Sequence, residues 1–231
     1  MTEMEKYRIF DNELEKLVER VLKMSNLVQE QVSNAILALN NCDLDLANHV
    51  IENDHKVDKL DVKIDKLCQK IFALQQPVAT DLRYIISSLK INNDLERIGD
   101  HAVNIAKRID SLSDYTNFCN ELGVTEIANQ IVMLTKDVDQ LIKTQQPILA
   151  NDIFQNARTI KDSCHKISEK IIEEMMQQKE VIVVATNIMI IVNLLERIAA
   201  YSTNIAESII FVIDGKIVKH KKKTDEQSNN L

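Results

Sequence analysis

The sequence predicts an all-α protein made of two tandem, pseudo-symmetric three-helix bundles with six long helices. Its 231 residues include only three Gly, two Pro and no Trp, so strands, tight turns and glycine-rich loops have little raw material. Apolar residues instead recur at helical spacing over long stretches. A motif in the first half also returns 100 residues later in the second half. Together these three observations favour a duplicated helical unit.

Helix-breaking residues are so few that they locate the ends of the expected helices. They include Asn40-Asn41, Pro77, the segment 110–123, Pro147 and Gly215. In the first half they predict helices near Glu3–Leu39, Leu44–Leu74 and Ala79–Ser111. In the second half they predict helices near Val124–Thr144, Ile148–Met176 and Val181–Ile213. The joints inside each half are short, so neighbouring helices are expected to run antiparallel.

The repeated motif lies in the last predicted helix of each half. Leu95-Glu96-Arg97-Ile98 recurs as Leu195-Glu196-Arg197-Ile198, and Asn104-Ile105-Ala106 recurs as Asn204-Ile205-Ala206. Helical periodicity alone rarely produces so many matches at one constant offset, which indicates a duplicated unit. We therefore expect a first bundle at residues 1–112, a second at 113–218, and a basic, polar tail at 219–231.

Charge and hydropathy disfavour several classes of protein. Lys and Arg total 28 against 35 Asp and Glu, a net charge of −7, so no nucleic-acid partner is expected. No uninterrupted apolar stretch reaches the roughly 18 residues of a membrane span, and the N-terminus lacks an apolar signal core. We expect a cytoplasmic protein, peripheral to the membrane at most. Four dispersed cysteines without a CxxC pair predict reduced core thiols: Cys42, Cys68, Cys119 and Cys164.

The second predicted helix sorts its residues into three stripes. The apolar stripe, expected to face the core, is Val57, Leu60, Ile64, Leu67, Ile71 and Leu74. An aspartate stripe, about 110° to one side, comprises Asp54, Asp58, Asp61 and Asp65. A lysine stripe, about 100° to the other side, comprises Lys56, Lys59, Lys63, Lys66 and Lys70. Acidic and basic side chains are thus segregated rather than paired.

The aspartate stripe is a candidate metal site. Carboxylates one helical turn apart repel each other by about 0.2 to 0.5 kcal/mol per pair. A multivalent cation would convert this repulsion into binding, because hard cations and iron accept carboxylate oxygens. The third predicted helix adds Glu96 and Asp100, one turn apart, and a close approach of backbone, metal or a neighbouring helix would explain Gly99. The candidate ligands are Asp54, Asp58, Asp61, Asp65, Glu96 and Asp100, and a solvated acidic face is the alternative interpretation.

The second half lacks the acidic stripe at the repeat offset. The four aspartates correspond to Phe154, Arg158, Lys161 and His165, and Asp100 corresponds to Ala200. Only Glu196 remains, as a remnant of a second-half site. We therefore expect one metal site in the first half and no equivalent site in the second.

Two segments resemble the PhoU family: Gln76-Pro77-Val78-Ala79-Thr80-Asp81-Leu82-Arg83, and the run from Asp94 to Ala106, DLERIGDHAVNIA. The ending from Asp214 to His220 is similar too, so the resemblance covers nearly the whole chain. It implies two three-helix bundles, a homodimer, and a cytoplasmic, non-enzymatic regulator of the Pst phosphate ABC transporter and its sensor histidine kinase. It also implies multinuclear metal sites on the bundle surface, and the carboxylate ligands favour iron, manganese, magnesium or zinc in no decided order.

Other functions stay open at this point. A metal-free helical scaffold would present the same surfaces to another phosphate transporter. A di-metal carboxylate enzyme would use Glu52 with His55 and Asp162 with His165, but helical rotation turns Glu52 and His55 away from the core. The basic run Lys219 to Lys223 is interpreted as a solvated tail, with contact to an anionic membrane or an acidic partner as the alternative.

Overall fold

The computed structural model describes residues 3–75, 77 and 79–215, and every regular element within them is helical. The first half contains α1 (Glu3–Asn41), α2 (Leu44–Gln75) and α3 (Ala79–Ala106). A linking segment holds the 3₁₀ helix η1 (Asp110–Tyr115) and the short α4 (Thr116–Leu122). The second half contains α5 (Val124–Thr144), α6 (Pro147–Gln177), the 3₁₀ turn η2 (Lys179–Val181) and α7 (Ile182–Asp214).

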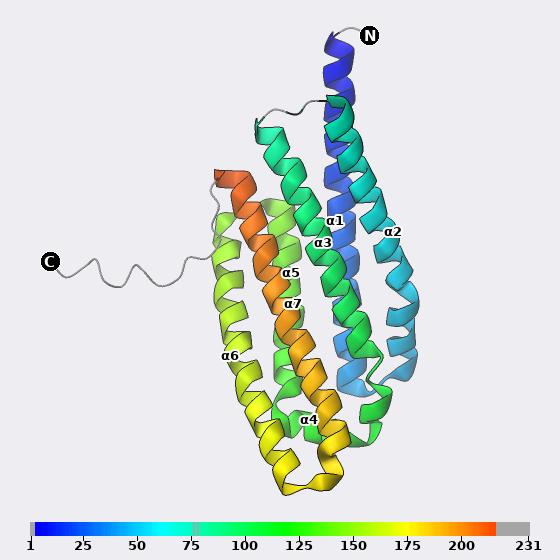
Figure 1. The fold of residues 1–231 in the computed structure, drawn as a ribbon, viewed down its shortest axis with the longest axis vertical. Helices are drawn as coiled ribbons and strands as arrows, with labels where there is room; N and C mark the ends of the chain where they lie inside the picture. Colours follow the sequence, from blue (N-terminus) through cyan, green and yellow to red (C-terminus); the bar gives the residue numbers. More distant parts are fainter. Residues whose placement is uncertain (1–2, 76, 78, 216–231) are drawn as a thin grey trace, which may run out of the picture.

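The six long helices lie side by side as two groups of three (Figure 1). α1, α2 and α3 contact one another, and so do α5, α6 and α7. α3 packs against α7 and α1 packs against α5, so the two groups share one continuous apolar core. The prediction of an all-α fold with six long helices is confirmed. The tail expected at 219–231 lies outside the described residues.

The apolar stripe of α2 faces the core as predicted, except at its end. Val57, Ile64 and Ile71 are at most 1% exposed, whereas Leu74 is 64% exposed. The stripe advances every 3.5 residues on average while the helix turns every 3.6, so each heptad rotates the stripe by about 20°. By Leu74 it has rotated onto the lysine side of the helix. The assignment of Leu74 to the core is therefore wrong.

The end of the third helix also differs from the prediction, because α3 stops at Ala106 instead of Ser111. Beyond it, backbone N–H groups bond three residues back, from Arg108 to the Ile105 carbonyl at 3.0 Å and from Leu112 to the Ile109 carbonyl at 2.9 Å. This tighter turn leaves Ile109 and Leu112 at most 1% exposed, and burying them favours the turn over another α-helical turn. The segment 110–123, expected as a simple connection, holds η1 and α4.

A polar contact ties the two halves together inside their interface. The buried Ser25 hydroxyl of α1 donates a hydrogen bond to the Asp139 carboxylate of α5 over 2.9 Å. Lys143, one turn further along α5, pairs with the same carboxylate. The buried Asp139 charge is thus both hydrogen-bonded and paired, as burial of a charge requires.

The helical segment Lys179–Asp214, which includes α7, is the one described helix long and apolar enough, by length and composition, to cross a membrane. Inside the protein, 44% of its most apolar window is buried. α7 contacts α3, α5 and α6, and its inward side chains Ile188, Leu195 and Ile198 are 0% exposed. A core helix surrounded by other helices has the same composition.

Three of the four cysteines are buried as predicted: Cys68, Cys119 and Cys164. Burial raises the pKa of Cys68 to about 12 and that of Cys119 to about 11. Burial, with a contribution from the charge of Glu196, raises the pKa of Cys164 to about 12. These three thiols are therefore protonated at neutral pH and behave as small apolar side chains. Cys42 is half-buried at the joint between α1 and α2, with a φ of 50°.

Candidate metal centre

The predicted carboxylates lie along the groove between α2 and α3. The α2 side contributes Asp54, Asp58, Asp61 and Asp65, and the α3 side contributes Glu96 and Asp100. Partial loss of hydration, followed by the charges of Asp54 and Asp100, raises the pKa of Asp58, although its side chain is exposed. Burial, Asp100 and, from the other helix, Asp61 raise the pKa of Glu96. Because charges on each helix act on the other, the six residues form one acidic groove.

Two buried amides hold the aspartates of α2. Asn92 of α3 is 0% exposed, and its Nδ2 donates to the Asp61 carboxylate over 2.7 Å and to the Asp65 carboxylate over 3.2 Å. Gln31 of α1 is 5% exposed, and its Nε2 donates to the Asp54 carboxylate over 3.0 Å. Among the described residues, the amide oxygen of each has no hydrogen-bond partner. Both amides are thus committed to the carboxylates, which they orient at three positions along the stripe.

The acidic groove holds more negative charge than its own cations neutralise. Partial burial raises the pKa of Asp61 and Asp100, and neighbouring aspartates raise each of them further. An ion pair of 3.6 Å joins Arg97 Nε to Glu96 Oε2, but the Arg97 side chain is half exposed and screened by solvent. A bound cation would relieve the remaining repulsion and favour the charged form of each carboxylate.

The carboxylates share the groove without converging on one point. Among the side chains that the structure describes, no three of His, Cys, Asp or Glu lie close enough together to hold a metal ion. Residues one turn apart have Cβ atoms about 5 to 6 Å apart, so a change of side-chain rotamer can bring their oxygens together. The donors are carboxylates throughout, a set that suits hard cations and iron rather than soft metals.

The second half lacks the supporting amides as well as the carboxylates. Asn92 corresponds to Val192 at the 100-residue offset of the motif in α3 and α7. The ends of α1 at Asn41 and of α5 at Thr144 are 103 residues apart, which places Leu134 at the position of Gln31. Both counterparts are buried apolar residues. Glu196, half-buried on α7, is the carboxylate that remains there. Gln31 and Asn92 were absent from the candidates drawn from the sequence, although the comparison of Asn92 with Val192 in the repeated motif is a signal for one of them.

Gly99 marks a close approach of three helices. A Cβ at this position would lie 3.4 Å from Val57 Cγ1 and 3.5 Å from Gln31 Oε1, which are ordinary van der Waals distances. α1 and α2 therefore both approach α3 here. A methyl group would still fit at this position, so the packing accommodates glycine without requiring it, and the repeat counterpart is Ala199.

The residues of the enzyme alternative lie on the surface. Glu52, His55, Asp162 and His165 are all exposed. The Nδ1 atom of His55 lies 2.6 Å from the backbone carbonyl oxygen of Glu52 in its own helix. A ferritin-type centre requires ligands that project inward from facing helices, so this geometry does not support one.

Replacing Asn92 with the valine found at its repeat counterpart is expected to lower the free energy of unfolding by about 1 to 3 kcal/mol. The change leaves the Asp61 and Asp65 carboxylates without their buried donor. Because the Asn92 hydrogen bond lowers the pKa of Asp61, that pKa should also rise, which carboxyl-carbon NMR can follow. Urea denaturation gives the stability, with Asn93→Val, an exposed change on the same helix, as the control. Equal stability of Asn92→Val and wild type would contradict the supporting role.

Known proteins share this architecture. The family model described as "PhoU domain" matches the chain twice, at residues 21–109 and 124–209. The phosphate-specific transport system accessory protein PhoU homolog of Rhizobium meliloti (strain 1021) is 30% identical over 96% of this chain and 94% of its own length.

Two crystal structures also match most of the chain. PhoU from Pseudomonas aeruginosa has a TM-score of 0.83 and 32% identity, covering 90% of this chain and 100% of that one. The phosphate transport system regulatory protein PhoU from Streptococcus pneumoniae has a TM-score of 0.82 and 31% identity, covering 91% and 100%. The resemblance seen in the sequence is confirmed, and the chain belongs to the PhoU family.

Proposed function

We propose that the protein regulates phosphate uptake and phosphate-starvation signalling. It acts as a helical adaptor on the cytoplasmic side of a Pst-type phosphate ABC transporter and on its sensor histidine kinase. The observation that carries the proposal is the match, over nearly the whole chain, to accessory proteins of the phosphate-specific transport system. The long helices suit an adaptor, since α2 alone has 32 residues and spans about 48 Å of side surface.

A metal bound in the acidic groove is the second part of the proposal. The ligands come from Asp54, Asp58, Asp61, Asp65, Glu96 and Asp100, and the metal is iron, manganese, magnesium or zinc. Support comes from carboxylates that raise one another's pKa and from the two buried amides that orient them. When bound, the metal supplies positive charge between α2 and α3. The second half, with Glu196 alone, holds no equivalent site.

We also propose that the protein is a cytoplasmic homodimer without catalytic activity. The names of its relatives describe accessory and regulatory proteins, which supports a non-enzymatic role. The apolar residues of α7 serve the core, which supports a protein that is at most peripheral to the membrane. Exposed Met176 and Val183, 81% and 75% accessible at the α6–α7 end, offer apolar surface for association of two copies.

Deleting the gene in its natural host tests the adaptor role. With ample phosphate, the deletion strain is expected to express a phosphate-starvation reporter at the level that wild-type cells reach only in starvation, and the wild-type gene should restore repression. Chemical cross-linking in the complemented strain should capture the transporter and the kinase. A reporter that stays repressed in the deletion strain would overturn the proposal. Full restoration by a variant that binds no metal would favour the metal-free scaffold instead.

A further inference from the structure

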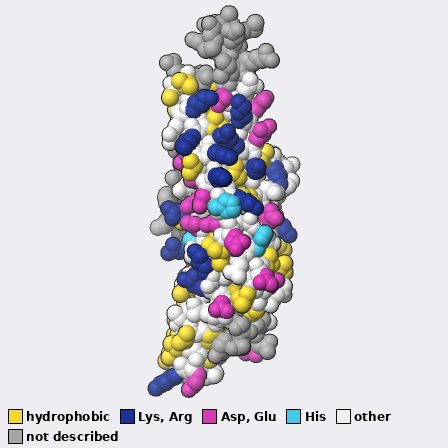
Figure 2. Space-filling view, turned by 90° about the vertical axis from the view of Figure 1, so that its right-hand side faces the viewer, with side chains coloured by type: hydrophobic (Ala, Val, Ile, Leu, Met, Phe, Trp, Pro, Cys, Tyr) yellow, Lys and Arg dark blue, Asp and Glu magenta, His cyan; other side chains and the backbone are white. Residues whose placement is uncertain are grey.

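A strip of cations runs along the groove between α1 and α2, on a protein whose net charge is −7. The basic strip consists of Lys16, Arg20 and Lys23 on α1 with Lys56, Lys59, Lys63, Lys66 and Lys70 on α2. Arg20 is half-buried and the other seven are exposed. Figure 2, which faces the α2 side of the molecule, shows Lys and Arg side chains gathered over its upper part. The acidic groove lies on the other side of α2, so the proposed metal makes no use of this surface.

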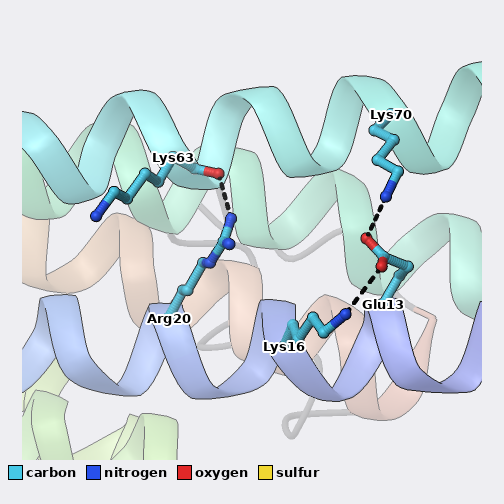
Figure 3. Close-up of polar contacts among 5 residues, drawn as sticks. All are labelled: Glu13, Lys16, Arg20, Lys63 and Lys70. Atoms are coloured by element: carbon cyan, nitrogen blue, oxygen red, sulfur yellow. Dashed lines mark hydrogen bonds and ion pairs between the residues drawn. The ribbon is translucent and has the colours of Figure 1, made fainter.

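Specific contacts fix the centre and one end of the basic strip (Figure 3). Arg20 Nη1 donates to the backbone carbonyl oxygen of Lys63 over 2.8 Å, while the Lys63 side chain points away from Arg20. Seven residues before Arg20 on α1, Glu13 pairs with Lys16 at 3.1 Å and with Lys70 at 3.2 Å, and Lys70 lies seven residues after Lys63 on α2. Burial alone would raise the pKa of Glu13, but the two ammonium groups lower it below its usual value. Glu13 therefore stays ionised and holds both lysines in place.

These contacts set the register of the antiparallel pair. The same register places Lys23 of α1 beside Lys59 of α2, and Lys16 beside Lys66. Cations of the two helices therefore follow one another along a band that spans Lys56 to Lys70, about 21 Å.

Segregating these cations is unfavourable for the isolated protein. Like charges three or four residues apart destabilise a helix, and the five lysines of α2 recur at that spacing throughout. The chain has more acidic than basic residues, so acidic residues could have alternated with the lysines on this face of α2. A strip of one sign attracts and orients an anionic partner, which offsets the repulsion once that partner is bound. We infer that the basic strip is the docking surface for an acidic α-helical segment of a partner protein.

The dimensions of the strip favour a helix over other polyanions. Its lysines recur about every 5 Å, and a helix laid into the α1/α2 groove would repeat its carboxylates at the same distance. A flat bilayer would also meet the exposed Glu15 and Glu19 beside the strip on α1. Single-stranded nucleic acid needs aromatic stacking platforms, but α1 has none after Phe10, and Phe72 of α2 falls on the aspartate side. Leu74, exposed one turn beyond the last lysine, offers the docked helix an apolar contact.

This inference goes beyond the proposed function, because it depends neither on the metal nor on which transporter is regulated. The probe is a fluorescent synthetic helix of about 20 residues, roughly 30 Å long, with glutamates at alternating spacings of three and four. Its control is a peptide of the same composition with the glutamates clustered at one end. Fluorescence anisotropy with the full chain, in the presence of a chelator, measures both affinities. We expect the regular helix to bind at least about ten-fold more tightly, and its binding to weaken as salt is raised past about 0.15 M.

Charge reversal locates the surface. Lys59→Glu/Lys63→Glu/Lys66→Glu is expected to weaken binding of the regular helix about ten-fold or more. The control Lys161→Glu/Lys166→Glu/Lys170→Glu changes three exposed lysines of α6 and the net charge equally, and should weaken it less than about two-fold. Circular dichroism checks that both variants fold, and the milder Lys→Gln triple at the strip should weaken binding in the same direction.

Three results would overturn the inference. Equal weakening by both triple variants would show that net charge alone attracts the peptide. Equal binding of the regular and clustered peptides would show that the spacing of the glutamates does not matter for binding. Binding of phosphatidylserine vesicles or of oligo-uridine RNA that is lost in the strip variant, with no binding of the regular helix, would assign the strip to lipid or nucleic acid.

Discussion

The Asp58→Asn/Asp100→Asn variant is expected to carry about a tenth or less of the metal bound by the wild-type protein, since even a lost supporting residue costs metal sites about 10- to 100-fold in affinity. Asp58 lies on α2 and Asp100 on α3, and each is a neighbouring charge in the same groove, so the double change removes a ligand from each side. Elemental mass spectrometry of protein purified without chelator or metal-affinity resin measures the content. Asp162→Asn/Glu173→Gln, two exposed residues of α6, gives a matched control.

The same variant should change stability in opposite directions with and without metal. Without metal, each like-charge pair removed stabilises the protein by a few tenths of a kcal/mol. With metal at about 100 times its dissociation constant, the wild type gains about 2.7 kcal/mol that the variant does not. Thermal denaturation of the variant and the wild type, with and without added metal, measures both changes in stability. Metal content equal to that of the wild type would place the ligands elsewhere, and a variant less stable without metal would show that these carboxylates support the fold by themselves.

Acidification provides a second measure of the same groove. The folded-state pKa values of Asp58, Asp61, Glu96 and Asp100 lie above their ordinary values, so the folded state binds protons more tightly than the unfolded state. In the metal-free protein this difference lowers the free energy of unfolding, and the effect is complete at pH values above the folded-state pKa values. It disappears as the pH falls toward about 4, the usual pKa of these groups in the unfolded chain. The lowered pKa of Glu13 acts in the opposite direction. The difference between wild type and the double variant isolates the groove, and that difference should shrink as pH falls.

The helices follow from local pattern where breakers and caps decide their ends. Gly215, for example, adopts a left-handed φ of 66°, and its N–H closes α7 on the Phe211 carbonyl at 3.1 Å. The end of α3 does not follow from local pattern, because the helix stops early so that Ile109 and Leu112 can be buried against other helices. Tertiary packing, which a single helix does not encode, decided that boundary.

The candidate site divides in the same way. The spacing of Asp54, Asp58, Asp61 and Asp65 on one helix was enough to predict an acidic stripe. Gln31 and Asn92 sit on α1 and α3, and their role depends on how those helices pack on α2. In sequence Gln31 follows Glu30 and Asn92 precedes Asn93, so no local pattern sets either residue apart from its polar neighbours. Their hydrogen bonds to α2 depend on how the helices assemble.

Ile98→Ala and Ile198→Ala are each expected to lower the free energy of unfolding by about 2 to 5 kcal/mol. Both side chains are at most 1% exposed, at equivalent positions of the repeated motif in α3 and α7. Each truncation removes buried apolar surface and leaves a cavity. The free-energy cost of this loss exceeds the small gain in helix propensity from alanine. Urea denaturation followed by circular dichroism measures the loss. Ile148 is 63% exposed, so the free energy of unfolding of Ile148→Ala should stay within about 0.5 kcal/mol of that of the wild type.

The shape of these unfolding curves also tests how far the bundles at 1–112 and 113–218 are separate domains. α3 contacts α7 along the interface, α1 contacts α5, and Ser25 is hydrogen-bonded to Asp139 between them, so each bundle completes the core of the other. Both variants should then shift one common transition, to a similar extent. Two transitions, with Ile98→Ala moving only one and Ile198→Ala only the other, would mean that the bundles unfold independently. A cavity in either half would in that case leave the other half folded, and the shared core would contribute little to stability.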